Sequence, residues 1–322
     1  MIRIDENKRL KEQLELAAKN IEITDNKVVN LVDAEAIRVL TDWKLIKPSG
    51  VKLSEFDTAE NLILVTARGF ANATILVGDG GLGKTYLTLD TIKSNFEPED
   101  WDYKSGFTTP LALYKYLYHN RTRKVLVLDD VEGLFEDHKS INLLKCATWD
   151  VGGQRLIQYD TTSEKANDVP RDFILTTKLV ILANKIPNED DINVSALLSR
   201  AIKYEVNFSH KVKLEIIKKV LDKRDGIDDS QRQLCYEIIT KNTTEATRNF
   251  NLRTMERLIS FLKYKPEKAE ALFKETLEVD ENKEAYLAAV KSSKVVNEQV
   301  AKFIELSGKC RKTFYNIKKK CK

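Results

Sequence analysis

The chain has 322 residues, a length that allows two or three domains. Its composition, 42% hydrophobic and 32% charged, is typical of a globular protein and excludes a fibrous or largely disordered one. No stretch approaches the about 18 apolar residues of a membrane span, and the polar start is unlike a signal peptide, so we expect a cytoplasmic protein without a membrane partner.

The first 57 residues predict an N-terminal helical cap and connector. Residues 6–20 have the apolar spacing of a helix, whereas 21–55 mix short apolar runs with Pro48 and Gly50. A second helix, expected over 58–70, leads into the main domain.

From residue 73 onward, short apolar runs alternate with segments of helical periodicity. This alternation predicts a parallel sheet covered by helices on both faces, the doubly wound α/β class. We assign 58–208 to this core. The expected strands are 73–77, 101–107, 124–128, 178–183 and 202–207, and the expected helices between them are 84–95, 109–119 and 139–149.

Beyond residue 208 the strands stop and helical periodicity continues to the end of the chain. Helices are expected over 210–263, with breaks near 225–226 and 242–251, and then over 267–293 and 296–320. We divide this part into a helical lid at 209–266 and a C-terminal module at 267–322.

A glycine-rich segment follows the first expected core strand and opens a helix. It reads Gly78, Asp79, Gly80, Gly81, Leu82, Gly83, Lys84 and Thr85, matches GxxxxGK[ST], and is followed by Tyr86. In such a P-loop the backbone amides and the helix N-terminus face phosphate oxygens, the lysine reaches the β- and γ-phosphates, and the hydroxyl binds Mg²⁺. Because both flanks are right, the segment predicts an ATP site rather than a chance turn.

Two acids end the apolar run at 125–128. Asp129 and Asp130 therefore lie at the carboxyl edge of the sheet, where ligands bind in open α/β folds. We expect Asp129 to hold Mg²⁺ through water and Asp130 to orient or deprotonate the attacking water. The alternative is a strand that ends in two solvated acids.

With these motifs the chain resembles the AAA+ ATPases over about residues 58–264. The resemblance implies a homo-oligomer, either a hexameric ring or a helical filament. It also implies roles for three residues. Asn184, at the end of strand 178–183, is similar to sensor 1 and would position water; Arg200, after 196–199, is similar to the arginine finger that reaches a neighbouring subunit's nucleotide; and Arg253, within 251–254, is similar to sensor 2 and would contact the γ-phosphate.

The chain departs from the family at the second acid, where most members have glutamate and this chain has Asp130. Aspartate is one methylene shorter, so Glu132 is a second candidate for activating water. Phe107 occupies the place where unfoldases of the family carry an aromatic pore loop, and a core position for this residue is equally compatible with the sequence.

The segment 150–171 is longer than a minimal connection, and Gly152 and Gly153 followed by 155–159 suggest a hairpin. In an assembled ring this hairpin would line a pore, with Arg155 and Lys165 facing a phosphate backbone. A plain surface hairpin is the simpler interpretation, which we favour.

The C-terminal end is basic: residues 291–322 carry a net charge of +8, whereas 1–290 sum to −4. The segment 299–319 resembles a helix-turn-helix, with Val300, Phe303, Ile304 and Leu306 as one apolar face, a turn at 307–310, and Cys310 in place of the usual serine cap. An ordinary helical hairpin with a basic face is the alternative. The side chains expected to contact DNA are Lys309, Arg311, Lys312, Thr313, Tyr315, Asn316 and Lys319.

The favoured hypothesis is a DNA-associated AAA+ ATPase that uses ATP and Mg²⁺ at subunit interfaces and acts in DNA replication, helicase loading or transposition, with a replication or transposition protein as a further partner. Its size and simple core resemble phage, plasmid or mobile-element ATPases, and a viral source would place it in the host cytoplasm. A protein remodeller is the first alternative. A superfamily-3-type DNA helicase, which does not predict the elements at 199–200 and 251–254, ranks behind it, and a non-enzymatic binding module ranks last.

Overall fold

A computed structural model describes residues 53–161 and 167–320, without the side chains of Glu132 and Lys320. The predictions for the N-terminal 52 residues, including the helix at 6–20, lie outside the described residues, as does Lys165. Within the described ranges, no helix is long and apolar enough to cross a bilayer.

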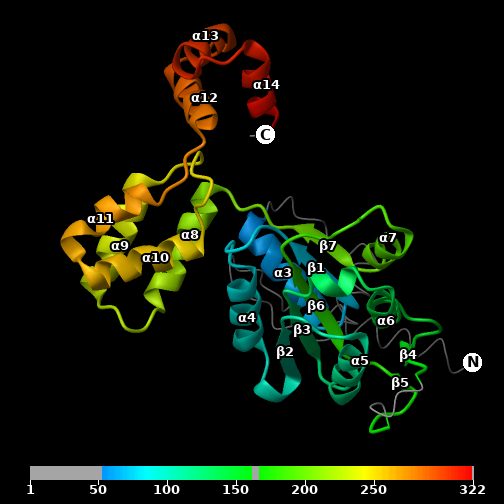
Figure 1. Ribbon diagram of the computed structural model, residues 1–322. Coiled ribbons are helices and arrows are strands. Elements are labelled where there is room, and N and C mark those ends of the chain that lie inside the picture. Colours follow the sequence, from blue (N-terminus) through cyan, green and yellow to red (C-terminus); the bar gives the residue numbers. More distant parts are fainter. Residues whose placement is uncertain (1–52, 162–166, 321–322) are drawn as a thin grey trace, which may run out of the picture. The chain divides into compact units, whose positions relative to one another are not determined.

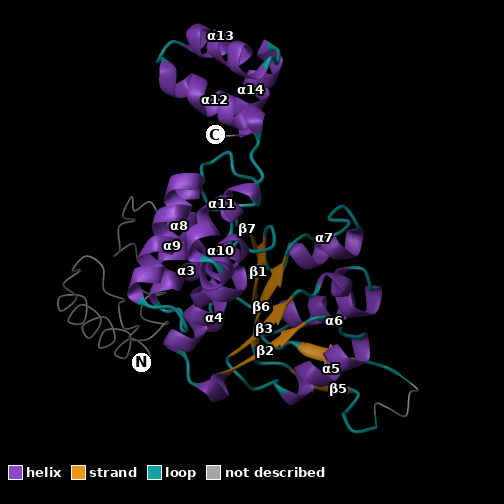
Figure 2. Ribbon diagram, turned by 60° about the vertical axis from the view of Figure 1, so that its left-hand side comes forward, coloured by secondary structure: helices purple, strands orange, loops and turns teal. Residues whose placement is uncertain are grey.

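The centre of the fold is a sheet of five parallel strands in the order β2–β3–β6–β1–β7 (Figures 1 and 2). The predicted strands are confirmed, and the strands beginning at Trp101 and Ile202 each end two residues earlier than expected. At the end of β2 the reason is Gly106, whose φ of 82° turns the chain out of the extended region. The strands are β1 (Ala73–Val77), β2 (Trp101–Ser105), β3 (Val125–Asp129), β6 (Lys178–Ala183) and β7 (Ile202–Glu205).

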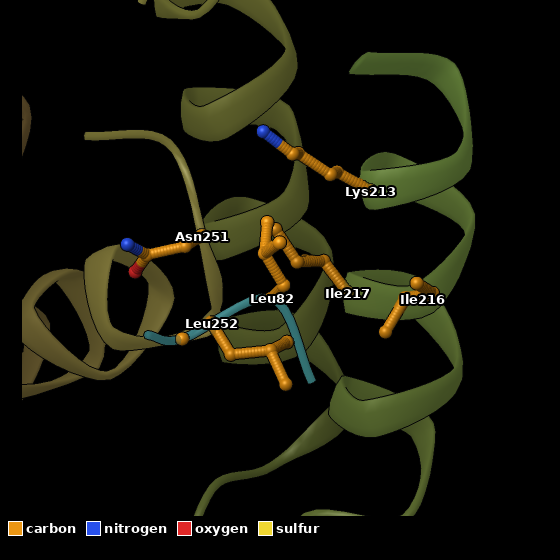
Figure 3. A pocket seen from close by; sticks show the side chains of 7 residues that line it. Leu82, Lys213, Ile216, Ile217, Asn251 and Leu252 are labelled. Atoms are coloured by element: carbon orange, nitrogen blue, oxygen red, sulfur yellow. The ribbon is translucent and has the colours of Figure 1, made fainter. Parts of the chain in front are cut away.

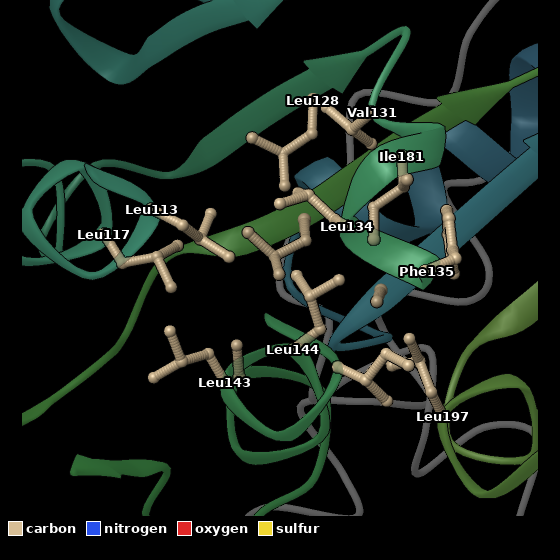
Figure 4. Close-up of a cluster of buried hydrophobic side chains, with 14 of the residues drawn as sticks. Leu113, Leu117, Leu128, Val131, Leu134, Phe135, Leu143, Leu144, Ile181 and Leu197 are labelled. Atoms are coloured by element: carbon tan, nitrogen blue, oxygen red, sulfur yellow. The ribbon is translucent and has the colours of Figure 1, made fainter. Parts of the chain in front are cut away.

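Alternate residues of the strands feed two apolar cores, one on each face of the sheet. On one face, Leu126 and Leu128 of β3 pack under α5 (Pro110–His119), α6 (His138–Thr148) and α7 (Ile192–Leu198), with the 3₁₀ helix η2 (Glu132–Phe135) (Figure 4). On the other face, Val125 and Val127 pack under α3 (Glu55–Ala67) and α4 (Lys84–Asn95). Helices therefore cover both faces, and the predicted doubly wound parallel α/β class is confirmed.

The start of α3 corrects the expected domain boundary at residue 58, which falls inside this helix. Ser54 caps α3 at Glu55: its Oγ accepts a hydrogen bond from the Asp57 amide at 3.1 Å, and the Asp57 carboxylate accepts one from the Ser54 amide at 3.3 Å. This reciprocal capping box satisfies two helix-end donors, and the helix begins at Glu55, three residues before the predicted segment 58–70.

The hairpin after α6 is present as two short antiparallel strands, β4 (Leu156–Gln158) and β5 (Asp172–Ile174), preceded by a tight turn through Gly152 and Gly153. Arg155 does not face outward from it. The residue is 4% exposed, and its guanidinium donates to the carbonyl oxygens of Ala147 at 2.7 Å and Thr176 at 2.6 Å. The pore-lining role for Arg155 is therefore wrong, because a buried guanidinium that donates to two backbone carbonyls cannot reach a phosphate backbone.

Four helices follow the sheet and share one apolar core, which we call the lid: α8 (His210–Asp222), α9 (Asp229–Asn242), α10 (Leu252–Tyr264) and α11 (Pro266–Glu275). Ala269 and Phe273 of α11 are fully buried in this core. The expected boundary at 267 is therefore too early, since it separates α11 from the helices on which it packs.

Three further helices form the C-terminal module: α12 (Glu281–Ser292), α13 (Val296–Ser307) and α14 (Arg311–Lys320). Their apolar cluster contains Tyr286 and Ala289 of α12, Phe303 of α13 and Phe314 of α14. The structure thus adds α12 to the predicted helical pair. Ile304 and Leu306, expected on the buried face, are 42% and 48% exposed.

Candidate functional site

The P-loop connects β1 to α4, and its lysine is held inside the loop. Lys84 is the first residue of α4 and is buried. Its Nζ donates to the carbonyl oxygens of Gly78 at 2.5 Å and Asp79 at 3.1 Å, and to Oδ1 of Asn184 at 3.1 Å. The ammonium group therefore joins the loop to the carboxyl end of β6, where Asn184 follows the strand.

The two expected metal ligands are in direct contact. Thr85 Oγ1 donates to Oδ2 of Asp129 at 2.7 Å, and Asp129 is 5% exposed at the end of β3. A hydroxyl and a carboxylate are the hard oxygen ligands that Mg²⁺ uses, together with waters and phosphate oxygens. No cluster of three or more acidic, histidine or cysteine side chains suited to a metal occurs in the described ranges. These residues fit a Mg²⁺ that is held jointly with a nucleotide.

Tyr103 of β2 joins this contact and was missed by the sequence analysis. Its hydroxyl donates to the same Asp129 oxygen, Oδ2, at 2.8 Å. Burial, and next its hydrogen bond with Asp129, raise the pKa of Tyr103, so the hydroxyl stays a donor. No local pattern marks this tyrosine, because its proximity to Asp129 depends on β2 pairing with β3.

Asn184 also contacts the second acid. Its Nδ2 donates to Oδ1 of Asp130 at 3.1 Å, while its own Oδ1 accepts from Lys84. Asp130 has a φ of 52°, in the left-handed region that non-glycine residues rarely adopt, and residues strained in this way tend to cluster at functional sites. The backbone of Glu132 opens η2 beside it, and its side chain lies outside the described residues.

The N-terminus of α10 lies directly on the P-loop. The Leu252 amide donates to the Gly81 carbonyl at 3.0 Å, and Asn251 caps α10 through the Thr254 amide at 3.2 Å. A side chain on Gly80 would lie 3.2 Å from Nη1 of Arg253. Leu82 and Leu252 face Ile216 of α8 across a small apolar recess beside the loop (Figure 3).

Residues of these segments line an open cavity of about 230 Å³ at the carboxyl edge of the sheet. The structure thus brings together most of the predicted nucleotide-site residues in one place. Burial raises the pKa of Tyr86, which also lines the cavity. The lining residues are Gly81, Gly83, Lys84, Thr85, Tyr86, Asp129, Asp130, Asn184, Leu252 and Arg253.

Arg200 is absent from the residues that line this cavity. It follows α7, where its Nη1 donates to the Lys145 carbonyl at 3.5 Å and its guanidinium carbon lies 6.0 Å from the centre of the Trp149 ring. A role toward the nucleotide of the same chain therefore finds no support in its position.

Phe107 lies in the loop between β2 and α5 and is 88% exposed. The alternative that it is a core residue is therefore wrong. Its ring lies near Gly133, where an added Cβ would be 3.8 Å from it.

Most side chains proposed to contact DNA are exposed on α14 and the preceding turn. Lys309, Arg311, Lys312, Asn316 and Lys319 are exposed, and Tyr315 is 40% exposed. Thr313 is half-buried, and its hydroxyl lies 3.6 Å from the Cys310 sulfur. Hydrogen bonds from Thr313 lower the pKa of the Cys310 thiol at this helix start.

No family model matches this sequence. It is similar to an uncharacterized 36.7 kDa protein of the nrdC-mobD intergenic region of Enterobacteria phage T4, with 27% identity over 212 residues. The match covers 60% of this chain and 64% of that protein, so the chain spans less than two thirds of the relative it matches.

Solved structures with similarity include the RuvB Holliday junction branch migration motor of Thermotoga maritima, at 18% identity over 81% of this chain and 84% of that one, with a TM-score of 0.40. The ORC2 protein of Aeropyrum pernix in its ADP form is 11% identical over 85% and 86%, with a TM-score of 0.41. NtrX from Brucella abortus in complex with ATP is 13% identical over 88% and 72%, with a TM-score of 0.39. Similarity at this level assigns no activity.

Proposed function

We propose that this protein is a Mg²⁺-dependent ATPase of the AAA+ kind. The observation that carries the proposal is the convergence of three chain segments on one cavity: the P-loop, the acidic end of β3 and the polar end of β6, joined by the Thr85–Asp129 and Lys84–Asn184 hydrogen bonds. In this proposal the Lys84 ammonium group, which now donates to the loop carbonyls, would donate to the β- and γ-phosphates when ATP is bound. Thr85 and Asp129 would hold Mg²⁺, which would supply positive charge that offsets the charge on the phosphates.

Water activation falls to Asp130 in this proposal, and its contact with Asn184 supports the choice. The amide of Asn184 restrains both the lysine that would bind phosphate and the acid that would orient water. Asp130→Asn should therefore abolish hydrolysis while ATP binding persists. If Glu132→Gln does so instead and Asp130→Asn does not, the base is Glu132.

Hydrolysis would take place between subunits of a homo-oligomer, a hexameric ring or a filament, with Arg200 reaching the neighbour's nucleotide. Two features support this: Arg200 is absent from the cavity of its own chain, and its hydrogen bond to the Lys145 carbonyl is at the long limit, 3.5 Å. A loosely held guanidinium is available to stabilise transition-state charge elsewhere.

A mixing experiment tests the site and the subunit interface together. Lys84→Ala should lose ATP binding, whereas Arg200→Ala should bind ATP normally and lose hydrolysis. Mixed with each other, the two inactive variants should regain part of the activity, because one subunit supplies the site and its neighbour the arginine. If Arg200→Ala alone hydrolyses ATP at the wild-type rate, the inter-subunit role of Arg200 is wrong.

DNA is the proposed partner, bound through the exposed basic residues of the C-terminal module. Truncation at residue 295 is a poor test, since it would uncover Tyr286 and Ala289 of α12. Replacing Arg311 and Lys312 with glutamine removes two charges and keeps the module intact. DNA affinity should fall and its salt dependence should become shallower by nearly one unit per lost phosphate contact.

The matched control for this experiment replaces two exposed lysines of the lid, Lys211 and Lys263, with glutamine. It removes the same charge from another surface and should leave DNA affinity nearly unchanged. Equal losses in both double variants would mean that only overall charge matters, and the assignment of the C-terminal module would fail.

Protein remodelling is the second candidate function, and the exposure of Phe107 favours it over the remaining alternatives. An exposed aromatic side chain on an open loop is suited to gripping an extended polymer. ATPase stimulation by unfolded protein, lost in Phe107→Ala, would support remodelling. Stimulation by DNA, lost in the Arg311 and Lys312 variant, would support the favoured function.

The phage T4 relative agrees with a viral source, for which the site of action would be the host cytoplasm.

A further inference from the structure

One oxygen of the Asp129 carboxylate carries two hydroxyl hydrogen bonds. Oδ2 accepts from Thr85 at 2.7 Å and from Tyr103 at 2.8 Å. Among the described residues, no hydrogen bond ends on Oδ1. The carboxylate is therefore fixed by one oxygen, and its rotation about the side-chain bond is restricted.

The two donors differ in what they can do when a cation arrives. Thr85 is itself an expected ligand, so its oxygen would turn toward Mg²⁺. Tyr103 is on β2, where its ring is half-buried in the core under α3 and α4. The register of β2 and β3 pairs Tyr103 with Val127, two residues before Asp129, so its hydroxyl can reach the carboxylate. Its ring is thus anchored by packing that does not depend on a nucleotide.

We propose that Tyr103 is a positioning residue for the metal-binding carboxylate of Asp129, an inference that rests on the proposed Mg²⁺–ATP site. The tyrosine hydroxyl holds Oδ2 and would leave Oδ1 for a water of the metal, were Mg²⁺ bound there. Because outer-sphere partners of this kind orient ligands without touching the metal, their loss lowers metal-linked affinity by about 10-fold or more.

The test is Tyr103→Phe, which keeps the packed ring and removes only the hydroxyl. ATP binding is measured by calorimetry, once with excess Mg²⁺ and once with excess EDTA, on the full-length chain. The increase in affinity caused by Mg²⁺ should shrink about tenfold, equal to about 1.4 kcal/mol. The affinity in EDTA should stay unchanged, because Lys84 and the loop amides are untouched.

Tyr204→Phe is the matched control. Tyr204 is a half-buried tyrosine of β7 in the same core, with a pKa also raised by burial, but its hydroxyl donates to the Glu55 carbonyl at 3.4 Å instead of to a carboxylate of the site. Its removal should leave the Mg²⁺-dependent increase unchanged. Thermal unfolding of both variants without nucleotide shows whether the fold is kept.

Three outcomes decide the matter. A reduced Mg²⁺ effect in Tyr103→Phe alone supports the inference. A full Mg²⁺ effect in Tyr103→Phe, or an equal loss of affinity in EDTA and in Mg²⁺, overturns the positioning role and leaves the proposed function standing. If the wild-type protein takes up no ATP, the proposed function fails, and the inference fails with it.

Discussion

Replacing Gly78 with alanine tests how tightly the P-loop is packed against the sheet. Gly78 directly follows β1, and its amide donates to the Ala183 carbonyl at 3.1 Å. A Cβ added there would lie 2.5 Å from the carbonyl oxygen of Val206 and 3.2 Å from Cδ1 of Leu82. The first contact is with backbone, which cannot rotate away as a side chain can.

Relief of this clash requires the chain at Val206 to move away from β1. The Val206 amide donates to the Val77 carbonyl at 2.7 Å, so the movement stretches or breaks that hydrogen bond. Overpacking costs about 1–3 kcal/mol, and a lost backbone hydrogen bond adds about 1 kcal/mol. We therefore expect Gly78→Ala to lower the free energy of unfolding by about 2–4 kcal/mol, measured by urea denaturation, and to weaken ATP binding.

Gly80→Ala is the control within the same loop. Neither Gly78 nor Gly80 has a positive φ, so alanine adds no backbone strain at either position. The nearest atoms to a Cβ on Gly80 belong to the guanidinium of Arg253, the mobile end of a long side chain. Its stability should change by less than about 0.5 kcal/mol. If both variants lose the same stability, the backbone contact with Val206 is not what excludes a side chain at Gly78.

Three further changes have defined outcomes. Burial lowers the pKa of His210 below its usual 6.5, so below about pH 6.5 the unfolded chain is protonated more readily than the folded one, and stability should fall as the pH drops. In urea titrations at several pH values, His210→Gln should show a weaker dependence of stability on pH. Arg155→Met leaves the buried Ala147 carbonyl and the part-buried Thr176 carbonyl without their donor and should cost about 1–3 kcal/mol in the same assay, with DNA affinity unchanged. Phe107→Ala should alter the thermal unfolding midpoint very little, because the ring is exposed, and a large drop would contradict that exposure.

The strands, helices and P-loop could be read from the sequence because their signals are local. The run of four apolar residues before Asp129 predicts a strand buried on both faces, and β3 is that strand. The glycines and Lys84 at their spacing predict the loop between β1 and α4. The helix break expected near 242–251 ends where α10 begins, and Asn251 caps that helix through Thr254.

Contacts between distant segments were decided by the tertiary structure. Tyr103 reaches Asp129 only because β2 pairs with β3, and a strand's apolar period does not specify its neighbour. Arg155 carries the charge of a surface residue, yet it is buried and donates to the carbonyls of Ala147 and Thr176. Local sequence thus determined which elements form and which residues stand at their ends, whereas long-range packing chose their partners, because pairing and burial depend on residues far away in the chain.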